Sequence, residues 1–255
     1  MIRSHTPDRV HAPLFRRILL ATAENPCITD LNLSINMEAA EESYAESFAL
    51  LMQTTQSLKT LCFTLDGGVA SSQKRDIIAE AFGANQTLEN LSFQYCSETD
   101  MGEYILLRLG AHPRLRELKM EYHGNDSSVA EIHALASFLG FTTSLEHLGI
   151  GYYEFDKECM GHLVEGLHSN QSLTKLSVYS CIFNLEAFDV FRNFIQLDGT
   201  RSSIRELHLA NCKFAGSSTE AMKASILTMP DENQGTRSSI GSLLRVLYFD
   251  DNDEF

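Results

Sequence analysis

The chain has 255 residues, a length that suits one large domain or two small ones. Its 34 acidic and 20 basic residues give a formal net charge of −14, which argues against nucleic-acid binding because affinity for a phosphate backbone comes mainly from clustered Lys and Arg. Hydrophobic residues make up 44%, yet no apolar run approaches the roughly 18 residues of a spanning helix, so we expect a globular chain without a membrane segment. No signal-peptide core is visible and the 6 cysteines are too sparse for a disulfide scaffold, which favours a cytoplasmic, reducing location.

The chain opens with an arm that lacks periodicity. Residues 1–13 contain His5, Pro7 and Pro13 and predict a flexible arm, whereas residues 14–255 carry a repeating pattern. Residues 14–25 predict a helix that leads into the first strand, half of one repeat.

An apolar triplet with the spacing L-x-x-L-x-L recurs eight times, with conservative swaps, at intervals of 27 to 40 residues. The triplets begin at Ile28, Leu58, Leu88, Leu115, Leu145, Leu173, Ile204 and Leu244. Each triplet predicts a short strand, and we expect strands centred near residues 30–33, 60–63, 90–93, 117–120, 147–150, 175–178, 206–209 and 246–249.

The stretches between the triplets have helical periodicity and helix start signals. The start signals are the S-x-x-E boxes at Ser128–Glu131 and Ser217–Glu220, and the candidate N-caps Asp100, Asp156 and Asn184. Each repeat is therefore predicted to be one strand followed by one helix, with all strands parallel in one sheet. Helices are wider than the spacing between strands, so the stack should curve into an arc with strands on the concave face and helices on the convex face.

Three repeats carry a longer formula, L-x-x-L-x-L-x-x-N/C-x-L, that ends at Phe155, Phe183 and Phe214. The ninth position is expected where the strand turns, and its side chain is expected to satisfy buried backbone carbonyls. This position holds Asn36, Asp66, Cys96, His123, Tyr153, Cys181, Cys212 and Asn252. We interpret the cysteines among them as structural, and Asp66 and Tyr153 depart from the usual Asn or Cys.

These motifs resemble the ribonuclease-inhibitor-like class of leucine-rich repeats, and the resemblance covers nearly the whole chain. It implies an α/β leucine-rich repeat solenoid of about eight strands, a single horseshoe domain over residues 14–255. Chains of that class are mostly protein-binding scaffolds, so the resemblance implies a protein partner and no catalytic activity.

Five N-x-S/T sequons occur, and two of them, at Asn85 and Asn170, belong to a recurring Asn-Gln-Thr/Ser-Leu turn. We interpret these asparagines as parts of the repeat rather than as glycosylation sites.

The chain has none of the common nucleotide-binding, metalloprotease or nucleophile-elbow motifs, so we predict no cofactor, no metal site and no catalytic residue. His147 and His208 are expected on the concave face, two repeats apart, too far from each other for a shared metal.

The concave surface is the predicted site. Positions are counted from the first apolar residue of each repeat. Alternation along the strand leaves the third, fifth and seventh positions exposed to solvent on the concave face, and we place the eighth, as a turn residue, on the same face. The predicted protein-binding residues are Tyr95, Glu117, Lys119, Glu121, Tyr122, His147, Tyr152, Lys175, Tyr179, His208 and Tyr248. Tyrosine is common at binding hot spots, although it also simply favours strands.

The predicted function is a protein-interaction scaffold. The alternatives are a GTPase-activating regulator that resembles the Ran-type activators and the substrate-recruiting arm of a ubiquitin ligase. No capping helix follows the last triplet, so the final strand predicts either self-association at its edge or a fragment of a longer array. The long segment at residues 229–242 is interpreted as a disordered or a functional loop.

Overall fold

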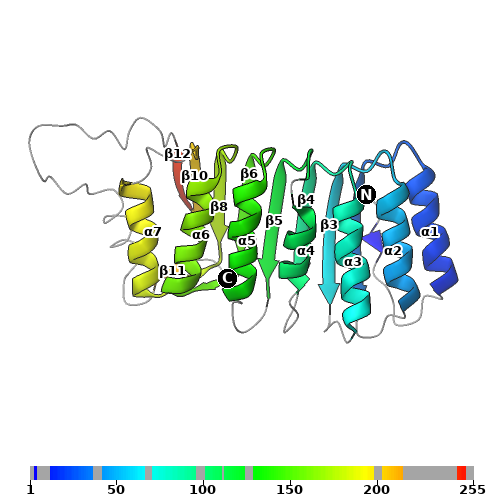
Figure 1. The fold of residues 1–255 in the computed structure, drawn as a ribbon, viewed down its shortest axis with the longest axis horizontal. Helices are drawn as coiled ribbons and strands as arrows, with labels where there is room; N and C mark the ends of the chain where they lie inside the picture. Colours follow the sequence, from blue (N-terminus) through cyan, green and yellow to red (C-terminus); the bar gives the residue numbers. More distant parts are fainter. Residues whose placement is uncertain are drawn as a thin grey trace, which may run out of the picture. The chain divides into compact units, whose positions relative to one another are not determined.

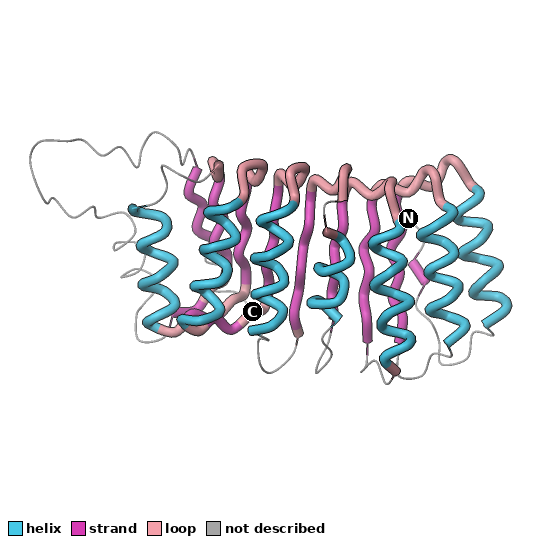
Figure 2. Tube along the Cα trace, viewed as in Figure 1, coloured by secondary structure: helices cyan, strands magenta, loops and turns pink. Residues whose placement is uncertain are grey.

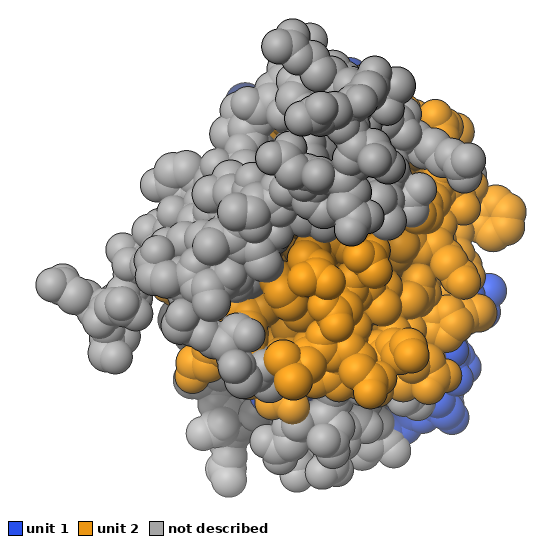
Figure 3. Space-filling view, turned by 90° about the vertical axis from the view of Figure 1, so that its left-hand side faces the viewer, with its two compact units in different colours: residues 1–125 blue, residues 126–255 orange. Residues whose placement is uncertain are grey.

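The computed structural model describes residues 3–4, 12–36, 42–66, 71–95, 101–110, 112–123, 129–197, 203–214 and 246–250. For residues 3–4, 12, 36, 66, 196–197 and 246–250 it describes the backbone alone. The chain divides into two compact units, unit 1 over residues 1–125 and unit 2 over residues 126–255 (Figure 3).

Unit 1 alternates strands and helices (Figure 1). Its strands are β1 (Arg3–Ser4), β2 (Asp30–Asn36), β3 (Thr60–Asp66), β4 (Asn90–Tyr95) and β5 (Glu117–Tyr122). Its helices are α1 (Ala12–Glu24), α2 (Glu42–Thr54), α3 (Ser72–Ala84) and α4 (Met101–Leu109). The strands pair in parallel in chain order, so that Leu31, Leu61, Leu91 and Leu118 lie opposite one another along a row. Within the predicted arm, β1 pairs with Asn32 and Leu33 of β2, a contact that the sequence did not predict.

Unit 2 repeats the same alternation. Its main strands are β6 (His147–Gly151), β8 (Lys175–Tyr179), β10 (Glu206–Ala210) and β12 (Val246–Asp250), paired in parallel in that order. A second parallel sheet contains β7 (Glu154–Phe155), β9 (Ile182–Phe183) and β11 (Lys213–Phe214). The described helices are α5 (Val129–Phe141), α6 (Lys157–Ser169) and α7 (Leu185–Leu197). The segment at residues 229–242 and the box at Ser217–Glu220 lie outside the described residues.

The eight predicted strands are therefore confirmed in position, and the pairing within each unit is parallel as predicted. In each unit the helices cover one side of the strands and the helix-to-strand turns gather at one end of them (Figure 2). The horseshoe arc and the single-solenoid domain stay predictions.

The core of each unit lies between its strands and its helices, because alternate strand residues point toward the helices. In β4, Leu91, Phe93 and Tyr95 are buried while the residues between them are half-buried on the opposite face. The Phe63 ring stacks on Phe93 at 5.9 Å and on Phe48 of α2 at 4.7 Å. Each such buried ring contributes about 1.5–3 kcal/mol of hydrophobic stabilisation, so these repeats hold together through their aromatic and leucine rows.

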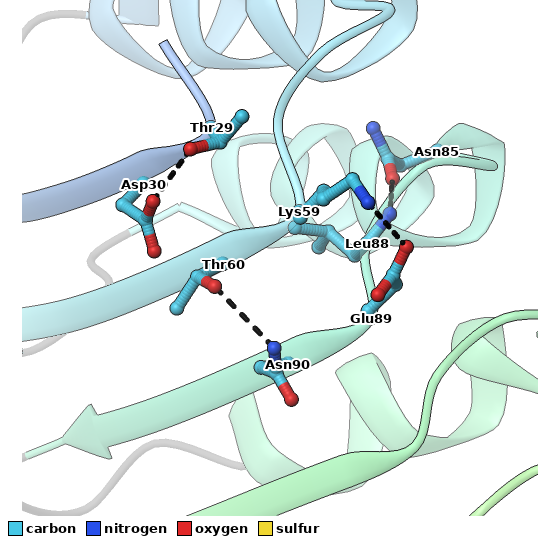
Figure 4. Close-up of polar contacts among 8 residues, drawn as sticks. All are labelled: Thr29, Asp30, Lys59, Thr60, Asn85, Leu88, Glu89 and Asn90. Carbon is cyan, nitrogen blue, oxygen red and sulfur yellow. Dashed lines mark hydrogen bonds and ion pairs between the residues drawn. The ribbon is translucent and has the colours of Figure 1, made fainter.

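The asparagines of the recurring turn tie neighbouring repeats together, as the sequence indicates. Asn85 is 1% exposed, its Nδ2 donates to the Met52 carbonyl at 2.8 Å, and its Oδ1 accepts from Leu88 N–H at 2.9 Å (Figure 4). Asn170 is also 1% exposed, and its Nδ2 donates to the carbonyls of Leu139 and Thr142. Buried side chains bonded in this way are structural, which confirms that the repeat accounts for these two sequons.

Two of the predicted N-caps are confirmed in unit 2. Asp156 accepts a hydrogen bond from Cys159 N–H at 2.8 Å, and Asn184 accepts one from Ala187 N–H at 2.7 Å. Asp100 and Ser128 lie outside the described residues.

Candidate protein-binding surface

The strands of the two units end differently. This difference decides which of the predicted site residues lie on the open face and which are buried. In unit 2 the eighth position of each described repeat adopts a positive φ, 66° at Tyr152, 53° at Ser180 and 54° at Asn211. A left-handed residue reverses the alternation, so the ninth residue turns inward. Tyr153, Cys181 and Cys212 are accordingly buried at the turn, as the longer formula predicts.

The described strand ends of unit 1 lack this turn. Two residues that were predicted on the open face therefore lie in the core instead. β4 and β5 continue through the eighth position, so Tyr95 and Tyr122 keep the alternation and point to the core. Tyr95 is 0% exposed and Tyr122 is 7% exposed, with their ring centroids 5.4 Å apart. The prediction that Tyr95 and Tyr122 lie on the open strand face is wrong, because we treated the eighth residue as a turn residue in every repeat. The ninth residue His123 is likewise exposed instead of buried.

The open strand face of unit 1 carries polar side chains that bind one another. Lys119 Nζ lies 2.9 Å from Glu117 Oε1 on the same strand. Gln94 accepts a hydrogen bond from the Thr64 hydroxyl and donates one to Glu121, whose carboxylate lies 3.7 Å from His123 Nε2. Glu117, Lys119 and Glu121 thus lie on the open face, as predicted, within local polar networks.

Further polar contacts lie near the start of the strands of unit 1, both within one repeat and between neighbouring repeats (Figure 4). Asn90 Nδ2 lies 3.4 Å from the Thr60 hydroxyl, and the Thr29 hydroxyl donates to Asp30 at 2.6 Å. The hydrogen bonds from Thr29 and Thr60 lower the pKa of the Asp30 carboxyl.

The open strand face of unit 2 carries an aromatic pair, the exposed Tyr152 and the half-buried Tyr179. Their rings meet edge to face with centroids 6.1 Å apart, and Tyr152 is 43% exposed. Tyr179 lies over Gly151, where a Cβ would come within 2.2 Å of the Tyr179 ring. The backbone holds the pair as well, because Tyr152 N–H donates to the Tyr179 carbonyl at 3.1 Å. The absence of a side chain at Gly151 therefore creates the seat for Tyr179, a role that the sequence analysis missed.

The same face carries polar residues nearer the start of the strands. His147 Nε2 lies 3.0 Å from the Ser177 hydroxyl, and His208 Nε2 lies 3.7 Å from Glu206. Lys175, His147 and His208 are half-buried on the open face, where the sequence places them. Tyr248 lies opposite His208 in the strand register, within a strand described by its backbone alone.

A buried acid lies away from this face, at the position where the sequence predicts a capping residue. Glu131 in α5 is 2% exposed, and its Oε1 accepts a hydrogen bond from the Tyr153 hydroxyl at 2.5 Å. Burial raises the pKa of Glu131 to about 8, although the bond from Tyr153 lowers it. The feature of the sequence that could have indicated the Glu131–Tyr153 contact is the tyrosine at the ninth position of its repeat, where Asn or Cys is usual.

The thiols at the turns are structural rather than reactive. Cys181 Sγ donates to the Tyr179 carbonyl at 3.4 Å, and Cys212 Sγ to the Val178 carbonyl at 3.5 Å. Burial raises the pKa of Cys212 to about 11 and that of Cys181 further, so both are protonated thiols at neutral pH. Cys96 lies outside the described residues.

The described residues contain no cluster of three or more His, Cys, Asp or Glu side chains placed to hold a metal ion. Nor does any helix among them have both the length and the apolar character needed to cross a membrane.

The chain has only a weak similarity to known proteins. No protein-family model matches the chain, and no curated protein matches it. Among solved structures, it is similar to actin-binding site 2 of leiomodin-1, with a TM-score of 0.40 and 18% identity over 60% of this chain and 87% of that chain. It is also similar to TLR13 in a complex with ssRNA13, with a TM-score of 0.30 and 12% identity over 73% of this chain and 33% of that one. Both scores are low, so the fold described here rests on the strand pairing and helix packing of the chain itself.

Proposed function

We propose that the chain is a non-catalytic protein-binding module whose partner docks on the open strand face of unit 2. The observation that carries the proposal is the pair of Tyr152, which is exposed on this face, and Tyr179, which lies half-buried over Gly151. His147, Lys175 and His208 lie on the same face, nearer the start of the strands. Glu117, Lys119 and Glu121, on the open face of unit 1, form a second proposed contact area.

The pair has the properties of a binding hot spot. Tyrosine offers a large apolar ring and a polar hydroxyl, and it loses little conformational entropy when it is bound. Tyr179 is already confined over Gly151, and the backbone of Tyr152 is fixed by its hydrogen bond to the Tyr179 carbonyl, so binding has less of the pair to order. Preorganised side chains lose less free energy on association, which favours a protein partner at this face.

The test compares capture of partners by the wild-type chain and by variants, quantified by mass spectrometry. Tyr152→Ala and Tyr179→Ala should each weaken the partner complex by about 1–3 kcal/mol, or roughly 5- to 150-fold. Gly151→Ala should weaken it as well, because the new methyl group displaces the Tyr179 ring while leaving it in the chain. Phe141→Ala is the matched control, since Phe141 is 71% exposed at the end of α5, away from the strand face.

The identity of the captured protein decides between the function and its alternatives. A small GTPase that depends on the two tyrosines would favour a GTPase-activating regulator, and ligase subunits would favour a recruiting arm. Tyrosine variants that are folded and retain every wild-type partner at full affinity would contradict the proposed face.

A further inference from the structure

Unit 1 has a hollow at the N-terminal ends of β2 and β3, beside the turns that connect α1 to β2 and α2 to β3. Its volume is about 630 Å³, within the range of roughly 300–1,000 Å³ found for ligand pockets. The apolar part of its wall includes Leu20, Ala23 and Pro26, and the polar part includes Glu24 and Lys59. The hollow belongs to unit 1 and shares no residue with the face proposed above.

The polar side chains in this hollow differ in what they can offer a ligand. The Ser57 hydroxyl already donates to the Asn25 and Ile28 carbonyls, and Lys59 Nζ lies 3.1 Å from Glu89 (Figure 4). Glu24 is exposed and has neither a hydrogen bond nor an ion pair with any residue that the structure describes. Its carboxylate is therefore the charged group available to a bound molecule.

The helix ends add to the negative character of the hollow. α1 ends at Glu24 and α2 ends at Thr54, and both residues line it. The last carbonyls of a helix carry partial negative charge and lack partners within the helix. The equivalent position in the next two repeats holds the uncharged Thr54 and Ala84, so only the first of these three helices combines its C-terminus with a carboxylate.

We propose that this hollow binds an arginine side chain from a basic segment of a partner protein. The guanidinium group has several donors in one plane, which suits a carboxylate at the C-terminus of a helix, and it is weakly hydrated. The alkyl stem would pack on Leu20, Ala23 and Pro26. The net charge of −14 attracts basic partners over longer distances.

The experiment uses two capped tripeptides, leucine–arginine–leucine and leucine–citrulline–leucine. Citrulline has nearly the shape of arginine but no charge. Each is titrated into the full chain while backbone amide signals are followed by NMR. The arginine peptide should shift signals from residues 20–29 and 54–59 and bind at least about tenfold more tightly than the citrulline peptide.

Three variants locate the charge. Glu24→Gln should weaken the arginine peptide by about tenfold, whereas Lys59→Gln should leave its affinity unchanged or higher. Glu46→Gln, an exposed acid of α2 outside the hollow, is the matched control and should bind as the wild type does. Equal binding of both peptides, signal shifts elsewhere, no binding, or full affinity in Glu24→Gln would each overturn the proposal. None of these results depends on Tyr152 or Tyr179, so this proposal and the proposed function can fail separately.

Discussion

Glu131 should make unit 2 less stable as the pH rises. Its carboxyl is buried with Tyr153 as a partner, and its pKa is raised from 4.5 to about 8. In the unfolded chain the same group ionises near its ordinary pKa. Between about pH 4.5 and 8 the folded chain therefore keeps a proton that the unfolded chain loses, and the free energy of unfolding falls with increasing pH.

The size of the effect follows from the difference in pKa. Each unit of difference corresponds to about 1.4 kcal/mol, so the loss reaches about 3 kcal/mol at pH 7 and at most about 5 kcal/mol above pH 8. It is a maximum because local opening around Tyr153 would relieve the buried charge. Glu131→Gln keeps an acceptor for the Tyr153 hydroxyl and removes the ionisation. This variant should match the wild type near pH 5 and exceed its stability increasingly toward pH 8.

The assay is urea unfolding followed by circular dichroism between about pH 5 and 8 at constant ionic strength. Hydrogen exchange of peptides from residues 129–155 assigns the change to this part of unit 2. Glu158→Gln, an exposed acid in the first turn of α6, is the control and should show the wild-type pH dependence. The reasoning is refuted if Glu131→Gln and the wild type lose stability in parallel across this range.

Four further substitutions test the packing. Gly166→Ala should destabilise the chain by about 1–3 kcal/mol in thermal melts, because the new Cβ would lie 2.6 Å from the Ala136 Cα. Gly161→Ala is its control and should be neutral or stabilising, because a Cβ there would have no atom within 4 Å beyond its chain neighbours and the backbone of its own helix. Asn170→Ala should cost roughly 2–4 kcal/mol in urea unfolding, since it leaves buried backbone groups unpaired; a cost below about 0.5 kcal/mol would contradict its role in the turn. Leu176→Asp should cost several kcal/mol because it buries an unpaired charge, and a fully stable variant would count against the buried row.

The repeat pattern alone determined the strands, their parallel pairing within each unit and the turn asparagines. An apolar triplet can bury its three side chains only as a strand covered by a helix, and a repeated spacing builds the same element again and again. This is why Asn85 and Asn170, which recur at the same place in their repeats, could be interpreted correctly as structural. It is also why His147, Lys175 and Tyr179 were expected on the open face.

Only the tertiary structure showed which way the eighth residue of each repeat points. It points inward if the strand continues and outward if the chain turns to positive φ there, and the turn occurs in the three repeats whose longer formula ends at Phe155, Phe183 and Phe214. Tyr95 and Tyr122 therefore lie in the core of unit 1, whereas Tyr152 is exposed in unit 2. Burial of Glu131 depends in the same way on Tyr153, a residue 22 positions along the chain that folding brings to it. Contacts of this kind come from packing between repeats, which no spacing within one repeat reveals.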